Sequence, residues 1–203
     1  MRDLTHIDFN AIAAGLHPDR AALFAASKIK LVGIRGANDS GAVQNSFAHY
    51  DDQILVFIDG APATAWLAST DPSWALVVHP IVSGGAAQLL PGIHLFEKHL
   101  MHAGTPREHW CLGQAEDVHI NRLNDDGTIN HADCGQYGIC IHSGGDGMDT
   151  GRFSAGCQII ENPDGYFQDP TWSKFWDPIR DAMSRLALLE VPYFLLNKSD
   201  LPA

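Results

Sequence analysis

The sequence predicts a mainly β fold of the α+β class, with a helical segment at its N-terminus and a helix near its C-terminus. Two observations support this prediction. Short runs rich in Val, Ile, Leu and Phe, bounded by Gly, Pro, Asn or Asp, recur through the middle of the chain, as is typical of strands. Apolar residues at three- and four-residue spacing lie near both ends. Strand-rich chains of this kind form sandwiches or curved sheets.

Helices are predicted at both ends of the chain. Apolar residues in the first segment, 1–29, recur at helical spacing, and Pro18 should divide it because proline cannot continue a helix. A second helix is predicted over residues 170–190, with Asp177–Pro178 as a helix start. No repeat or linker interrupts residues 30–203, so these form a single globular unit.

The centre of the chain is predicted to be strand-rich. Asp59–Gly60 is a turn signal that should join two neighbouring strands into a hairpin. The predicted strands are residues 30–34, 53–58, 63–69, 75–82, 92–96, 118–121, 137–141 and 193–196.

Composition and charge exclude several classes of protein. With 203 residues, 45% of them hydrophobic and 18% charged, the chain matches a folded globular domain rather than a disordered one. No stretch approaches the roughly 20 continuous apolar residues of a membrane span, so no membrane insertion is expected. Nucleic acid is not an expected partner, because the net charge is −11 and the basic residues are scattered rather than clustered.

The most informative stretch pairs a histidine with a cysteine. His142 follows an apolar run and precedes Ser143, and Cys157 follows Ser154, Ala155 and Gly156 after a glycine-rich loop. A thiol becomes a strong nucleophile when a neighbouring base removes its proton, and histidine is the usual partner. The sequence therefore predicts a Cys-His acyl-transfer site.

The other cysteines suggest no metal site. Cys111, Cys134 and Cys140 lack the CxxC spacing of a structural zinc site. Cys134 and Cys140 are near enough in sequence to bridge a short loop, and as free thiols they would be small residues of the core. The spacing leaves both possibilities open.

The Ile-His-Ser and Ser-x-Gly-Cys elements resemble the active-site motif of L,D-transpeptidases, the peptidoglycan enzymes with a YkuD-type catalytic domain. His142 matches the catalytic histidine of that motif, Ser143 the residue after it, and Ser154, Gly156 and Cys157 its last part. The spacer is short, Ala155 replaces a second histidine, and no arginine follows Cys157. The form Ser-Ala-Gly-Cys-Gln is similar to a divergent branch in phage-associated and other bacterial proteins.

The resemblance implies a fold, a reaction and a set of partners. It implies a YkuD-like β-sandwich over residues 30–203 as the catalytic domain. It also implies acyl transfer from a peptidoglycan stem peptide through a thioester on the cysteine, without a cofactor or metal. The acceptor would be an amine, giving L,D-transpeptidase activity, or water, giving carboxypeptidase or endopeptidase activity. The sequence begins without a secretory signal. We therefore expect synthesis in the cytoplasm and action at the cell wall after release or delivery.

The resemblance also assigns roles within the site. Cys157 would be the nucleophile, His142 the base, and the Ser143 carbonyl the group that orients the imidazole. Backbone N–H groups around Gly156 and Cys157 would hold the oxyanion. The expected substrate-binding residues are Gly156, Ser154, Arg152, Gln158 and Asp146. Asp149 is expected to bind substrate together with Asp146.

Two rival functions are compatible with the sequence. Histidines cluster between positions 94 and 142, and histidine with carboxylate is a zinc-binding combination, so a zinc-dependent cell-wall hydrolase is one alternative. The five tryptophans suit stacking on sugars or packing in the core, so a non-catalytic peptidoglycan-binding or phage structural module is the other.

Overall fold

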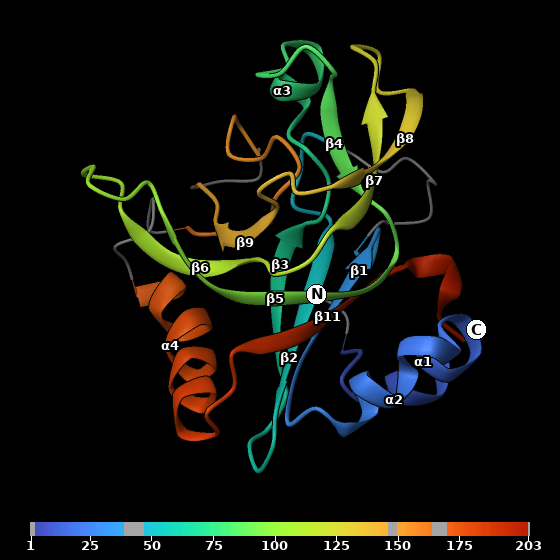
Figure 1. The fold of residues 1–203 in the computed structure, drawn as a ribbon, viewed down its shortest axis with the longest axis vertical. Coiled ribbons are helices and arrows are strands. Elements are labelled where there is room, and N and C mark those ends of the chain that lie inside the picture. The colour runs from blue at the N-terminus through green and yellow to red at the C-terminus, as the bar shows by residue number, and fades with distance from the viewer. Residues whose placement is uncertain (1–2, 39–46, 146–149, 164–169, 203) are drawn as a thin grey trace.

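The computed structural model describes residues 3–38, 47–145, 150–163 and 170–202, and it has the predicted mainly β fold (Figure 1). The helices are α1 (Phe9–Leu16), α2 (Pro18–Ala26), α3 (Trp74–Val78), α4 (Pro170–Arg185) and the 3-10 helix Lys198–Asp200. The strands are β1 (Ile29–Arg35), β2 (Asp52–Ile58), β3 (Thr64–Ser69), β4 (Ala86–Leu89), β5 (Gly92–Met101), β6 (His109–Gln114), β7 (Val118–Leu123), β8 (Ile129–Gly135), β9 (Cys140–Ser143), β10 (Gln158–Ile160) and β11 (Glu190–Asn197).

The larger sheet closes on itself instead of forming the expected sandwich. Its strand order is β1-β11-β5-β6-β9-β10-β3-β2, with β2 returning to β1. Closure depends on β10, which pairs parallel with β9 and antiparallel with β3. A strand of three residues has too little periodicity to be recognised in the sequence, which is why closure was not predicted.

Two apolar clusters lie on opposite faces of the barrel strands. Inward residues of β1 and β11, such as Leu31 and Tyr193, share a cluster with the apolar side chains of α4. Alternate residues of the same strands, such as Val32 and Phe194, pack against α1 and α2. Alternation along a strand places successive side chains on opposite faces, so each strand serves both clusters. Figure 1 shows α4 and the α1–α2 pair on opposite sides of the barrel.

Several segment predictions are confirmed and others are wrong. The division of the N-terminal helix at Pro18 is confirmed. Residues 75–82 do not form a strand. The helix α3 forms there instead, and it packs Val77 into a small apolar cluster with residues of β4 and β7. Pro178 lies within α4 rather than at its start. Strands β4, β6, β8 and β10 were not predicted.

A small sheet of order β4-β7-β8 stands beside the barrel and positions the motif loop (Figure 1). The backbone N–H of Ala87, in β4, donates to the carbonyl of Ala155 at 3.0 Å. Ser73, which precedes α3, donates its N–H to the carbonyl of Ser154 at 2.7 Å. The segment that carries the cysteine is therefore fixed on two sides.

The barrel encloses a buried polar network around Arg35. Its guanidinium lies 3.1 Å from Asp71 Oδ1 and donates to the carbonyls of Thr70 at 2.9 Å and Leu89 at 3.0 Å. Asp52, also fully buried, accepts from the Thr70 hydroxyl at 2.7 Å. Burial, and then the charge of Asp71, raise the pKa of Asp52 to about 7.

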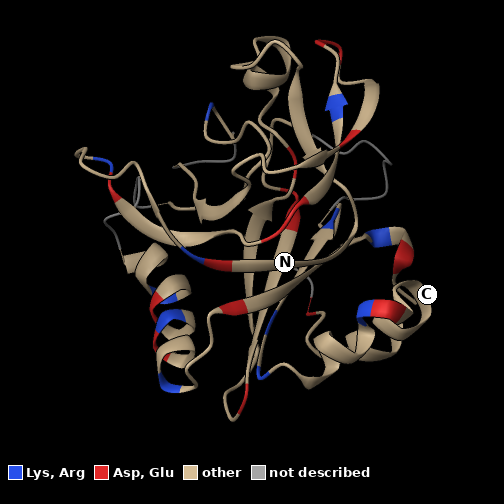
Figure 2. Cartoon of the chain, viewed as in Figure 1, with Lys and Arg blue, Asp and Glu red and all other residues tan. Residues whose placement is uncertain are grey.

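None of the described helices is long and apolar enough to cross a membrane. Lys and Arg are interspersed with Asp and Glu over the chain and gather into no continuous stripe in Figure 2.

Candidate active site

The parallel pairing of β9 with β10 brings the predicted catalytic residues together. Gln158 lies opposite Ile141, and Ile159 opposite His142. Extending this register by one residue sets Cys157 beside Cys140. Because side chains alternate along a strand, Cys157 then lies on the same face of the sheet as His142.

The imidazole of His142 is oriented as a base. Its Nδ1 lies 2.7 Å from the carbonyl oxygen of Ser143, the contact expected from the sequence. A carbonyl only accepts, so Nδ1 carries the proton and Nε2 is left with its lone pair. The His142 side chain is 1% exposed, and its buried Nε2 has no hydrogen-bond partner among the described residues. This is the arrangement that a general base requires.

The Cys157 thiol lies in an environment that favours the protonated form. The thiol of Cys140 is the first cause of a raised pKa at Cys157, and burial is the second. The nearby imidazole of His142 acts in the opposite direction but is outweighed. The backbone N–H of Cys140 donates to Cys157 Sγ at 3.4 Å. These surroundings therefore favour the thiol over the thiolate at Cys157.

Replacing Cys140 with alanine is expected to lower the pKa of Cys157, because it removes the largest cause of the upward shift. Alkylation of Cys157 by iodoacetamide, followed across pH by peptide mapping, should then begin at a lower pH than in the wild type. Replacing the exposed Cys134 serves as the control and should not move the profile. An unchanged or higher midpoint in Cys140→Ala would contradict this assignment.

The turn before the cysteine is built by Ser154 and Gly156. The Ser154 hydroxyl donates to the carbonyl of Cys157 at 2.6 Å and accepts from the N–H of Gly156 at 3.1 Å. Gly156 has φ +150°, and a Cβ there would lie 2.6 Å from the carbonyl oxygen of Ala87. Only glycine fits this position. Ser154 and Gly156 therefore hold the nucleophile in place.

The backbone N–H groups around Gly156 and Cys157 were the expected oxyanion donors. The N–H of Gly156 is already donated to Ser154, so it does not point toward the reacting sulfur. The N–H of Cys140 points toward Cys157 Sγ, a contact that no local motif indicates because Cys140 belongs to the neighbouring strand.

The remaining predicted substrate-binding residues are Gln158, Arg152 and Asp146. Gln158 is fully buried, where it donates to the carbonyl of Gly156 at 3.2 Å and accepts from Tyr193 at 3.0 Å, so it supports the turn from inside. Arg152 is exposed before the motif turn. Asp146 and Asp149 lie outside the described residues.

Cys157 opens onto a pocket of about 380 Å³ between the barrel and the small sheet. Its wall is apolar where it is formed by Ile81, Val82 and the start of β4, and polar where it is formed by Arg122, Gln136 and Tyr137. Sequence reasoning missed Arg122, because it lies 35 positions before Cys157, on a strand of the other sheet. No local motif marks it.

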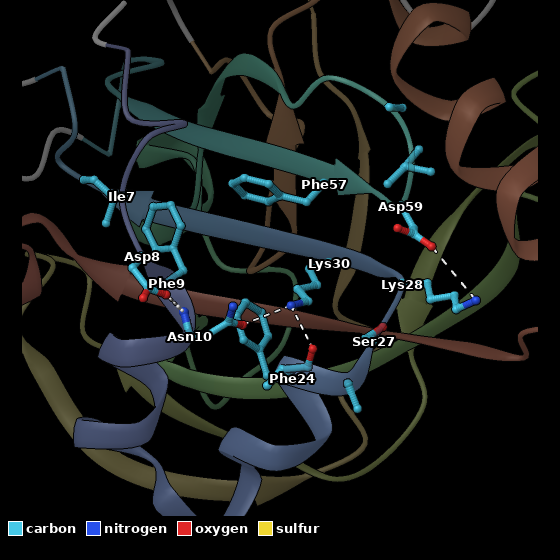
Figure 3. Close-up of a pocket in the computed structure, with 14 residues that line it drawn as sticks. Ile7, Asp8, Phe9, Asn10, Phe24, Ser27, Lys28, Lys30, Phe57 and Asp59 are labelled. Atoms are coloured by element: carbon cyan, nitrogen blue, oxygen red, sulfur yellow. Dashed lines mark hydrogen bonds and ion pairs between the residues drawn. The ribbon is translucent and has the colours of Figure 1, made fainter.

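A second pocket, of about 450 Å³, lies between α1, α2 and the strands β1 and β2 (Figure 3). Lys30 reaches across it, donating to Asn10 Oδ1 at 2.9 Å and to the carbonyl of Ala25 at 3.1 Å. Neither cysteine nor histidine lines it. It shares no lining residue with the Cys157 pocket.

The other cysteines and the histidines form no further centre in the part of the chain that the structure describes. All four cysteines are free thiols, so Cys134 and Cys140 are not bridged. His109 lies near His142, with ring centroids 6.2 Å apart, but the described residues contain no group of three or more His, Cys, Asp or Glu able to hold a metal ion.

The tryptophans divide between core and surface. Trp172 and Trp176 are buried and stack on each other on the face of α4. Trp74 and Trp110 are 41% and 50% exposed. Exposed aromatic rings keep a sugar-binding surface among the alternatives.

Comparisons with models of protein families, with curated proteins and with solved structures find no match to this chain.

Proposed function

We propose that this chain is a cysteine acyltransferase related to the YkuD-type L,D-transpeptidases, acting on peptidoglycan stem peptides. The observation that supports the proposal most is the state of His142. Its Nδ1–H is held by the Ser143 carbonyl at 2.7 Å, and its unpartnered Nε2 is buried on the face of the sheet that carries Cys157. The motif residues quoted from the sequence supply the family and the substrate class.

In the proposed reaction, Cys157 Sγ attacks the carbonyl carbon of the third residue of a stem peptide while His142 Nε2 takes the thiol proton. The tetrahedral intermediate collapses to a thioester, and His142 returns the proton to the departing amine of the terminal D-alanine. An acceptor amine or water then attacks the thioester carbonyl while His142 takes its proton, and the C–S bond breaks as the sulfur regains that proton from His142. The raised pKa of Cys157 agrees with a proton that leaves during attack rather than before it.

Mass spectrometry of purified tetrapeptide muropeptides tests this proposal. Wild-type protein is expected to release terminal D-alanine, cleave the stem or form cross-links, and Cys157→Ala is expected to do none of these. Cys134→Ala, which removes the exposed cysteine, should retain activity. The products identify the acceptor.

Two outcomes would reject the thiol mechanism. Activity that is lost with EDTA and retained in Cys157→Ala would favour the zinc-dependent hydrolase. Binding to purified peptidoglycan without any turnover would favour the non-catalytic module.

A further inference from the structure

We propose that Arg122 forms a subsite in the Cys157 pocket for a carboxylate carried by the acyl donor. The inference rests on the proposed function for naming the occupant an acyl donor. The argument about charge rests only on the residues that line the pocket. Of the described residues that line it, Arg122 is the only Lys or Arg, and none is Asp or Glu. In a chain of net charge −11, this pocket therefore presents a cation at its wall.

The guanidinium of Arg122 is held in place on several sides. Its Nη1 donates to the carbonyl of Gly85 at 3.2 Å, and its plane lies over the ring of Tyr137, 4.7 Å from the centroid. Asp133 Oδ2 lies 3.7 Å from its Nε. The side chain is only 14% exposed. A guanidinium fixed in this way loses little conformational entropy when it binds a ligand.

Arg122 retains donors for a ligand. Its Nη2 donates no hydrogen bond to any of the described residues, and a guanidinium has five N–H donors in a planar fork that matches a carboxylate. Its acidic neighbour among the described residues, Asp133, is 41% exposed and does not line the pocket, so water weakens the attraction of Asp133 for the cation. The carboxylate of a ligand would accept from Nη2, and not from the Nε that lies near Asp133.

The rest of the wall defines what accompanies the carboxylate. Ile81 and Val82 are 72% and 50% exposed and line the pocket together with the alanines of β4. The expected donor therefore has an acyl carbon at Cys157, an apolar portion along this wall, and a carboxylate at Arg122. Arg122 is a specificity residue in this assignment, since it holds the substrate and takes no part in bond breaking.

A pair of maleimides tests the subsite without requiring turnover. In both reagents the Cys157 sulfur adds to the double bond and the proton goes to the neighbouring carbon, so nothing leaves. Maleimidohexanoic acid carries a carboxylate at the end of its arm, and N-hexylmaleimide carries none. The measured quantity is the ratio of the second-order rates of the acid and neutral reagents at Cys157, followed by peptide mapping. Both rates depend on the same thiol, so a change in the reactivity of that thiol cancels in the ratio.

Arg122→Gln is expected to lower this ratio by about five- to tenfold, the range for losing a charge-assisted contact in a partly open site. Arg122→Lys should retain part of it. Asp133→Asn should raise it, because the competing carboxylate is removed. Arg107→Gln, which removes an exposed arginine elsewhere, makes the same change of net charge and should leave the ratio as in the wild type.

A ratio in Arg122→Gln within twofold of the wild-type value would overturn the subsite, as would a lowered ratio in Asp133→Asn. The Lys and Asn variants decide the question if the Gln variant fails to fold. The subsite and the proposed function fail separately. An Arg122-dependent ratio without muropeptide turnover would leave the subsite and reject the stem-peptide function. Muropeptide turnover with an unchanged ratio would leave the stem-peptide function and reject the subsite.

Discussion

Replacing His142 with alanine is expected to lower the rate of acyl transfer at neutral pH by about 10²- to 10⁴-fold, the usual contribution of a positioned general base. The structure gives two reasons. The pKa of Cys157 is raised by Cys140 and by burial, so little thiolate is present without help. Among the described residues, His142 is the neighbour that acts to lower that pKa.

Two measurements separate a catalytic effect from a structural one. The rate of muropeptide turnover should fall, and the pH at which iodoacetamide begins to alkylate Cys157 should rise, because the lowering influence of His142 is gone. A histidine on another strand provides the control: His119→Ala on β7 removes an exposed imidazole and should change neither. Turnover of His142→Ala within tenfold of the wild-type rate would contradict its role as the base.

Replacing Arg35 with methionine is expected to lower the free energy of unfolding by about 3–5 kcal/mol, the range for removing one partner of a buried ion pair. Arg35 and Asp71 are 7% and 1% exposed, and the substitution would leave Asp71 buried without its counter-ion. It would also leave the carbonyls of Thr70 and Leu89 without the donors that they now have. Asp52 would lose the cation that partly offsets its burial.

Chemical denaturation followed by tryptophan fluorescence measures this loss. Arg180→Met is the matched control, because Arg180 pairs with Asp177 and Asp181 on the surface of α4 and should cost less than about 1 kcal/mol. Adding Asp71→Leu to Arg35→Met should recover part of the lost stability, since both buried charges are then removed. Equal losses for Arg35→Met and Arg180→Met would show that the buried network contributes no more than a surface pair.

The fold was predictable where the pattern is local and strong. The helices on either side of Pro18 and the strands β1, β2 and β3 follow directly from apolar spacing and turn residues. The prediction failed where packing overrides propensity. Val77 belongs to a segment that reads as a strand, but α3 is stabilised by burying it against the small sheet. Closure of the barrel depends on three residues of β10, too few to carry a pattern.

The residues of the candidate site could be proposed from the sequence, but their geometry could be predicted only partly. His142 and Cys157 were found from residue type, glycine content and the motif that they resemble, and the contact of His142 with Ser143 was expected between sequence neighbours. Gln158 was expected to bind substrate, but it lies buried beneath the turn. A residue beside a motif in sequence can point to the opposite side of a strand, which alternation along β10 decides.

The sequence by itself determined the mainly β class, the helices at either end, and the candidate nucleophile and base, because these depend on local spacing and on the chemistry of single side chains. Only the tertiary structure decided that the barrel closes, that Cys140 raises the pKa of Cys157, and that Arg122 lines the pocket. These features join residues from separate strands. Their energies depend on burial and on distances through space, which the order of residues along the chain does not specify.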